Sequence, residues 1–452
     1  MLTYSLKKSP GVPLYEALYR CIRRDILSGN LKPGEKLPSK RALAQNLEVS
    51  KITVETAYSQ LLEEGYISSR EKVGYFVEAV DRSRTREKRL PREPEPAFRL
   101  PAPSVHFPFS VWSRLQREVM LDYGQKLLSP IPNQGIPELR QAIAGHLADF
   151  RGMDVDPRNI LIGAGTDFLY NLLIQLLGRE LIYAVEDPGY EKIRRIYEAG
   201  GVSILSAQMD EKGVNPRSLG NARVLHISPT HHFPTGIVTP MSRRQELLGW
   251  ANRHHGWIIE DDYDSEFRFA AHPLPAMQSM DPGRVIYMNS FSKSLAPSIR
   301  ISYMVLPTAL MEKFQKNLGF YGCTVSSFEQ YTLARFLSRG FFEKHINRMR
   351  RFYKKQRNRA IAQLKAWKYA DRLTIYEQDA GLHFLIKLDT TLSDRELSAL
   401  LESRELPIRC LTDYYYGQNS RDLHCLAVSY GDFPEESMEK ALQALESLME
   451  KP

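Results

Sequence analysis

The chain has 452 residues, of which 43% are hydrophobic and 25% charged, and its formal net charge is +8. This length predicts two or three domains, and the composition is that of a soluble globular protein, which excludes fibrous and membrane-embedded classes. No stretch approaches the roughly 18 consecutive apolar residues of a membrane span, and the first residues lack the apolar core of a signal peptide. Four scattered cysteines without metal-binding or disulfide spacing fit a reducing compartment. We therefore expect a cytoplasmic protein without a membrane partner.

The positive charge is concentrated near the N-terminus. Residues 1–100 hold 19 basic and 13 acidic side chains, which leaves the remainder of the chain close to neutral. A basic segment on a near-neutral body suggests a polyanion partner for that segment. A solubilising surface would give the same imbalance.

The first eighty residues have the pattern of a winged helix-turn-helix. An apolar stripe of helical period runs through 13–27, Ser39 can cap a second helix, and Ser50 can cap a third that ends at Gly65. Two short apolar strands follow, and in this arrangement the third helix enters the DNA major groove. Three amphipathic helices would also fit a docking or dimerisation domain.

The candidate DNA contacts lie at the start of the third helix, at the helix N-termini and in the wing. Base edges would be read by Lys51 and Thr53, with Arg41 reaching in from the second helix. Glu55, on the same helix, could accept from a cytosine amino group or repel phosphate, and it is assigned no base. The other candidate DNA-binding residues are Ser39, Lys40, Ser50, Arg70, Lys72 and Gly74.

Three runs in this segment resemble the GntR class of bacterial regulators, namely LPSKRALA (37–44), VSKITV (49–54) and LLEEGYI (61–67). The resemblance covers about residues 12–80 and implies a DNA-binding function. It departs from many relatives at Glu55, where they carry an arginine. We take residues 1–80 as the DNA-binding domain.

Residues 81–100 contain seven basic and four acidic side chains, and the stretch 81–96 has almost no apolar ones. Such a segment cannot bury a core, so we expect a solvated tether between the first domain and a second that spans residues 101–452. The basic side chains could also contact the DNA backbone.

In the second domain, helical stretches alternate with short apolar strands at 159–163, 181–185, 223–227, 256–260 and 285–288. This alternation predicts an α/β fold with a mostly parallel sheet. Ligands bind such folds at the carboxyl ends of the strands.

The run SFSKSLAPSIR (290–300) is the most informative chemical signal. The amine of Lys293 can condense with an aldehyde, while Ser290, Ser292 and Arg300 can hold a phosphate nearby. Pyridoxal phosphate combines these two groups. A lone lysine would more often be a surface residue.

Other candidate ligand groups follow the predicted strands. Gly165 and Thr166 open a helix whose N-terminus favours an anion. Asp261 ends an apolar strand, where a buried carboxylate needs a cation. Tyr190 lies in a turn, and the loop at 228–236 carries paired histidines without a third ligand at suitable spacing, so we expect no metal. Taken singly, each signal also fits an ordinary loop.

Together these motifs occur in the order found in fold type I aminotransferases. The runs IEDDYDSEF (259–267), FSKSL (291–295) and ISYMVLP (301–307) resemble the MocR subfamily, in which a GntR-type winged helix is fused to an aminotransferase-like effector domain. The resemblance implies that Lys293 forms the imine with pyridoxal phosphate, that Asp261 pairs with the pyridine nitrogen and that Tyr263 meets the ring hydroxyl. The implied phosphate ligands are Gly165, Thr166, Ser290, Ser292 and Arg300. Tyr190 would line the ring or the effector.

The resemblance also bears on the effector. In the branch that senses GABA, two arginines bind the effector carboxylate, and the matching positions here are Lys192 and Asp413. An acid at 413 should repel a carboxylate and favour an amine or a neutral group, although Arg409 could take the place of the missing arginine.

We therefore expect a transcription regulator that binds promoter DNA and responds to a small amino-bearing effector. The resemblance implies a head-to-tail homodimer. Two alternatives fit the same residues: a working aminotransferase that carries a DNA-binding module, and a sensor of free pyridoxal phosphate.

Overall fold

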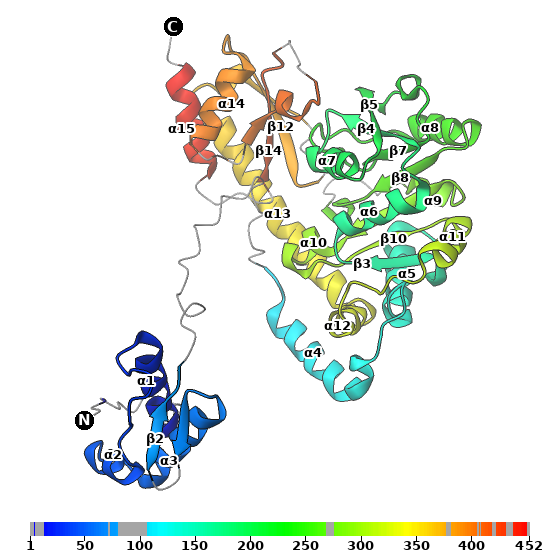
Figure 1. The fold of residues 1–452 in the computed structure, drawn as a ribbon. Coiled ribbons are helices and arrows are strands. Elements are labelled where there is room, and N and C mark those ends of the chain that lie inside the picture. The colour runs from blue at the N-terminus through cyan, green and yellow to red at the C-terminus, as the bar shows by residue number, and fades with distance from the viewer. Residues whose placement is uncertain are drawn as a thin grey trace. The chain divides into compact units, whose positions relative to one another are not determined.

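The structure is a computed structural model, and it describes residues 4, 13–70, 73–79, 106–267, 275–376, 381–404, 406, 408–417, 422–430 and 437–449. The chain divides into two compact units, residues 1–99 and 100–452, which are described separately (Figure 1). Lys72 and the segment 81–100 lie outside the described residues. Within the described stretches, no helix is both long enough and apolar enough to cross a bilayer.

The N-terminal unit is a winged helix-turn-helix, as the sequence predicted. Its elements are α1 (Leu14–Ser28), α2 (Lys40–Asn46), α3 (Lys51–Glu63), β1 (Ile67–Arg70) and β2 (Gly74–Val77). Ser39 caps α2 by accepting from the Ala42 amide at 3.1 Å, and Ser50 caps α3 by accepting from the Thr53 amide at the same distance. Each such cap contributes about 1 kcal/mol. The sequence placed Arg70 in the turn of the wing, whereas β1 continues through Arg70 and pairs it with Gly74. The two strands otherwise lie where they were predicted.

A small core joins these elements. Leu18 and Ile22 of α1 meet Leu43 of α2 and Leu61 of α3, and all four are fully buried. Their helical spacing places them on the inner faces of the three helices. The exposed start of α3 is thereby fixed relative to the wing.

The large unit is built around an eight-stranded sheet, ordered β3-β10-β9-β8-β7-β4-β5-β6. The strands are β3 (Ile160–Gly163), β4 (Ile182–Asp187), β5 (Ser203–Asp210), β6 (Gly213–Val214), β7 (Val224–Ile227), β8 (Trp257–Asp261), β9 (Val285–Ser290) and β10 (Ser302–Val305). Neighbours from β9 to β5 pair in parallel, while β10 is antiparallel to both β3 and β9. The predicted mostly parallel α/β sheet is confirmed.

Helices surround this sheet and lead to a second one. The helices are α4 (Phe109–Tyr123), α5 (Pro137–Arg151), α6 (Thr166–Leu177), α7 (Glu191–Ala199), α8 (Met241–Arg253), α9 (Met277–Met280), α10 (Phe291–Ser294), α11 (Thr308–Leu318), α12 (Ser327–Ser338) and α13 (Phe341–Lys365). Figure 1 shows the long α13 running from α12 toward the second sheet. That sheet has the order β11 (Leu373–Tyr376), β12 (His383–Leu388), β14 (Cys425–Ser429), β13 (Ile408–Cys410), and it packs with α14 (Asp394–Ser403) and α15 (Ser437–Met449).

Apolar clusters lie against the large sheet and fix its position. Leu169, Leu173 and Ile174 of α6 are buried with Met288 of β9 and Met304 of β10. Burial of such side chains contributes about 25 cal/mol per Å² of apolar area. Because β3, β4, β7, β8 and β9 point in one direction, their carboxyl ends lie along one edge of the sheet, where ligands bind in this class of fold.

Candidate functional site

Five strands deliver candidate ligand residues to this edge. Gly165 follows β3, Tyr190 follows β4, Ser228 follows β7, Asp261 ends β8, and Ser290 ends β9. The chain positions are far apart, but the parallel pairing brings the strand ends together.

Lys293 lies in the short α10, between β9 and β10. Ser290 caps this helix: its Oγ accepts from the Ser292 amide at 3.1 Å and donates to the Ser292 Oγ at 2.9 Å. The His345 Nε2 lies 2.7 Å from the carbonyl oxygen of Ser294, which ties α10 to α13. The partly buried Lys293 is therefore carried by a backbone that is held at both ends.

The β3–α6 turn and Arg300 form a compact cationic corner. Gly165 has φ +88°, and a Cβ there would lie 2.3 Å from the Arg300 Nη2, so only glycine lets the guanidinium lie against this turn. Arg300 donates to the Ala164 carbonyl oxygen at 3.3 Å. Together with the N-terminus of α6 at Thr166, it offers the donors that a phosphate needs.

Asp167 lies beside this corner and holds two cations. Its carboxylate is 3.2 Å from Arg300 and 2.8 Å from Lys192. Burial opposes ionisation here, but the hydrogen bond and charge of Lys192, with a smaller effect from Arg300, lower the pKa of Asp167. The structure therefore places Lys192 with the predicted phosphate ligands.

Asp261 is buried and has one oxygen without a partner. The Tyr170 hydroxyl donates to its Oδ2 at 2.5 Å, and the His226 Nε2 lies 3.4 Å from the same oxygen. The Tyr197 hydroxyl lies 2.7 Å from the other ring nitrogen of His226. The Oδ1 of Asp261 is buried and accepts no hydrogen bond from the described residues. A buried carboxylate oxygen without a donor is costly, and a protonated ring nitrogen would supply the donor.

Tyr263 lies next to the paired histidines. Its hydroxyl is 3.4 Å from the His231 Nδ1, which is also 2.9 Å from Asp264. Burial raises the pKa of Tyr263 well above its usual value, so the phenol stays protonated and can donate. Burial lowers the pKa of His232 to about 3. Among the residues that the structure describes, no three His, Cys, Asp or Glu side chains are grouped to hold a metal.

An aromatic cluster lines the same region. The ring of Phe233 lies 6.1 Å from that of Tyr190, 5.1 Å from that of Tyr414 and 5.1 Å from that of His383. The Gly189 amide donates to the Tyr414 carbonyl oxygen at 3.0 Å. Sequence reasoning found Tyr190 but missed the other three, because His383 and Tyr414 come from the second sheet and the turn after it.

The two remaining effector candidates belong to the second sheet and the turn that follows it, because Arg409 lies in β13 and Asp413 comes just after this strand. Asp413 accepts hydrogen bonds from the Ser398 hydroxyl of α14, at 3.0 and 2.9 Å. Burial raises the pKa of Asp413, while the nearby positive charge of Arg409 opposes the shift. Lys192 and Asp413 therefore each have a partner within the protein, and neither is held as an open carboxylate clamp.

The described candidates for DNA contact in the N-terminal unit are all exposed or partly exposed. Lys51 and Arg41 are exposed, whereas the Thr53 hydroxyl lies 2.8 Å from that of Ser50. Lys40 pairs with Glu55 at 2.7 Å, and this pair lowers the pKa of Glu55. Glu55 is therefore paired with a cation of the same domain.

The wing carries two further candidates. The Arg70 guanidinium lies 4.5 Å from the centre of the Phe76 ring. Gly74 has φ +134°, and a Cβ there would lie 3.1 Å from the Lys36 Cε. Outside the wing, the exposed Ser39 is the N-cap residue of α2. Lys72, the remaining candidate, is outside the described residues.

A buried charged cluster lies beside Asp261, and sequence reasoning missed it. Arg151, at the end of α5, pairs with Asp262 at 3.1 Å, and both side chains are fully buried. The Tyr287 hydroxyl donates to Asp262 at 2.6 Å. Burial, followed by the charge of Asp262, raises the pKa of Glu266 to about 8. The Asn289 amide donates to the same Glu266 carboxyl at 3.3 Å.

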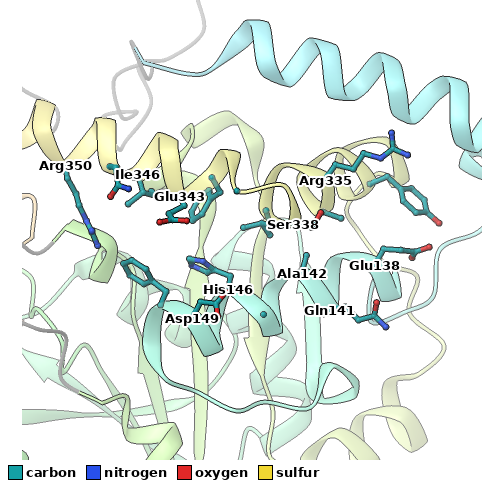
Figure 2. A pocket seen from close by; sticks show the side chains of 18 of the residues that line it. Glu138, Gln141, Ala142, His146, Asp149, Arg335, Ser338, Glu343, Ile346 and Arg350 are labelled. Carbon is teal, nitrogen blue, oxygen red and sulfur yellow. The ribbon is translucent and has the colours of Figure 1, made fainter.

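A cavity of about 870 Å³ lies between α5, α12 and α13 (Figure 2). Its wall includes His146, which stacks on Phe150 with ring centres 5.3 Å apart. The predicted cofactor and effector residues are not part of its lining. The cavity is therefore separate from the edge that carries Lys293.

Comparisons with known proteins divide the chain at the same place. Residues 14–77 match the bacterial regulatory proteins of the gntR family, and residues 103–445 match aminotransferase class I and II. The chain is 34% identical to the uncharacterized HTH-type transcriptional regulator YhdI of Bacillus subtilis (strain 168), over 99% of this chain and 98% of that protein. It is 32% identical to the probable rhizopine catabolism regulatory protein MocR of Rhizobium meliloti, over 98% and 95% of the two chains.

Two further likenesses concern the large unit and the whole chain. The HTH-type pyridoxine biosynthesis transcriptional regulator PdxR of Corynebacterium glutamicum is 31% identical, over 88% of this chain and 87% of that protein. The crystal structure of an archaeal alanine:glyoxylate aminotransferase superposes with a TM-score of 0.67 at 22% identity, over 79% of this chain and 92% of that one. The structural likeness at this identity shows the fold alone.

Proposed function

Because this chain belongs to the MocR-like regulators, which join a gntR-type helix-turn-helix to an aminotransferase class I and II domain, we propose that cofactor and effector binding in residues 101–452 controls promoter binding by residues 1–80. Residues 81–100 would connect the two. The proposal treats the aminotransferase fold as a sensor.

The observation that carries this proposal is the buried, donor-free Oδ1 of Asp261 at the edge that also bears Lys293 and the Arg300 corner. Pyridoxal phosphate supplies an aldehyde that condenses with primary amines. The Lys293 amine would hold it covalently, Asp261 would keep the ring nitrogen protonated, and the Tyr263 phenol would donate to the ring oxygen. The phosphate would be bound by Gly165, Thr166, Ser290, Ser292 and Arg300.

The network around Asp261 supports this role. Tyr170 and His226 hold one carboxylate oxygen and leave the other free. A carboxylate fixed in this way stabilises a positive charge in a site that excludes water. These two partners fix the orientation of the carboxylate.

The effector would carry a primary amine. The aromatic side chains of Tyr190, Phe233 and Tyr414 offer an apolar wall for its body. Asp413 is already satisfied by Ser398, so a carboxylate would depend on Arg409 alone, and an amine or a neutral effector fits better. We propose that such an effector competes with Lys293 for the aldehyde.

Control of DNA binding requires that the effector bind two conformations with different affinity. A head-to-tail homodimer would turn that difference into a change in the spacing of two winged helices, and hence in which pair of half-sites they fit.

The decisive measurement is the absorption spectrum of the full-length protein on titration with pyridoxal phosphate. The wild type should acquire a visible band, and Lys293→Ala should not, whereas Lys313→Ala, an exposed lysine of α11, should behave as the wild type. A visible band that persists in Lys293→Ala would refute the assignment.

A panel of amines added to the loaded protein then identifies the effector class. An effector should change the spectrum and the affinity for duplex DNA without continuous release of a keto acid. Steady release of keto acid would instead show a working aminotransferase.

A second candidate function is the sensing of pyridoxal phosphate itself. The name of the relative PdxR, a pyridoxine biosynthesis regulator, favours it. In that case cofactor-free protein should change its DNA affinity when pyridoxal phosphate alone is added, and unchanged affinity would exclude this function.

A further inference from the structure

The first turn of α3 exposes a large apolar side chain. Ile52 is 73% exposed, although single exposed apolar residues are common on protein surfaces. Its position is what sets it apart. Among the described residues of the N-terminal unit, the only other large apolar side chain counted as exposed is Val73, at 51%, in the turn of the wing. Both therefore lie on the parts that a winged helix presents to DNA.

Two polar neighbours of Ile52, Thr53 and Glu55, have partners inside the protein. The Thr53 hydroxyl lies 2.8 Å from that of Ser50, the N-cap of the same helix. Glu55, one turn further along, is paired with Lys40 at 2.7 Å. Ile52 is therefore an exposed apolar side chain at the start of α3, next to two polar side chains, Thr53 and Glu55, that already have partners within the protein.

We infer that Ile52 reads the 5-methyl group of a thymine in the major groove. This inference rests on the proposed DNA-binding function and adds a specificity residue to it. Of the four bases, thymine alone presents a methyl group in the major groove, and apolar side chains recognise this group by contact. Cytosine offers an amino donor at the corresponding edge and no methyl group, so an isoleucine there discriminates between the two.

The test uses DNA that lacks only the methyl group. The full-length wild type first selects its preferred duplexes from a random pool, and one of these is resynthesised with deoxyuridine in place of each thymidine in turn. Loss of one buried methyl group corresponds to about a fourfold loss of affinity. At one position the wild type should bind the deoxyuridine duplex about fourfold more weakly, and Ile52→Ala should bind both duplexes equally.

Val73→Ala is the matched control, since it removes an exposed apolar group from the wing. It should retain the wild-type sensitivity to deoxyuridine at that position. Because Ile52 is exposed, its replacement should leave the helical circular dichroism unchanged, which separates loss of contact from loss of fold.

Two results would overturn the inference. One is a wild type that discriminates thymidine from deoxyuridine nowhere, and the other is an Ile52→Ala protein that discriminates as the wild type does. If the wild type selected no duplex at all, the proposed DNA-binding function would fail too. That result differs from selection of a duplex without discrimination between thymidine and deoxyuridine, which would overturn the inference about Ile52 alone.

Discussion

The two candidate sites of this protein are built in opposite ways. On the N-terminal unit, Lys51, Ile52 and Arg41 are exposed, and the hydroxyls of Ser50 and Thr53 at the start of α3 pair three residues apart. Around Asp261 in the large unit, charged groups are buried and their partners are distant in sequence, as Tyr170 is from Asp261.

This difference separates function from stability in one site and couples them in the other. An exposed side chain can be replaced at little cost to the stability of the fold. A DNA-contacting surface built in this way can therefore change its base preference without unfolding the domain. A buried charged group is tied to its partner, so its loss affects both the site and the fold.

The largest expected effect is that of Arg151→Met. It leaves the Asp262 carboxylate buried and without its cation, which should lower the free energy of unfolding by about 3–5 kcal/mol. All four tryptophans, Trp112, Trp250, Trp257 and Trp367, lie in the large unit, so denaturant unfolding followed by tryptophan fluorescence reports on that unit alone.

The matched control is Arg158→Met, because the Arg158 side chain is 87% exposed and lies 2.6 Å from Asp156. A loss of less than about 1 kcal/mol is expected there. Equal effects of the two substitutions would remove the distinction between the buried and the exposed pair.

A smaller effect concerns pH. In the folded protein the pKa of Glu266 is raised to about 8, whereas in the unfolded chain it is about 4.3. Between these values the folded state binds the extra proton, so stability should fall as the pH rises, by at most about 1.4 kcal/mol per pH unit. Glu266→Gln cannot ionise and should flatten the decline between pH 6 and 8.

Measurement of the unfolding midpoint at several pH values checks this expectation. Glu312→Gln, an exposed carboxyl of α11, serves as the control and should leave the slope as it is in the wild type. A Glu266→Gln protein with the wild-type slope would show that this carboxyl is ionised in the fold.

The smallest effect on stability is expected for Lys51→Ala. The unfolding free energy should change by no more than about 0.5 kcal/mol, because the side chain is exposed. If Lys51 contacts a phosphate, the slope of log affinity against log salt should shrink by about 0.9. If it reads a base instead, affinity should fall for the preferred duplex and the slope should persist.

Much of the fold followed from local patterns. The caps at Ser39 and Ser50, the strand that ends at Asp261 and the lysine run after β9 each depend on a few consecutive residues. Each of these signals acts through backbone hydrogen bonding and burial within one element, so it can be read from a short window of sequence.

The partners of those residues did not follow in the same way. The pairing of Lys192 with Asp167, the Arg151–Asp262 pair and the aromatic contact between Phe233 and Tyr414 join elements that are separate in the chain. The sequence around Lys192 does not show whether this lysine lies beside the cationic corner or binds an effector. The packing of α6 against α7 decides it.

The amino-acid order was therefore enough to place a helix-turn-helix, a parallel sheet and a lysine just after β9, because helix caps, periodicity and strand-end chemistry are properties of neighbours in the chain. It was not enough to say which carboxylate oxygen stays free, which acids are neutralised or which aromatic rings meet. Those features depend on distances of a few ångströms between segments that approach only after the sheets and helices have packed. The interaction energy of charges in a buried site changes steeply with such distances, which the order of the residues does not specify.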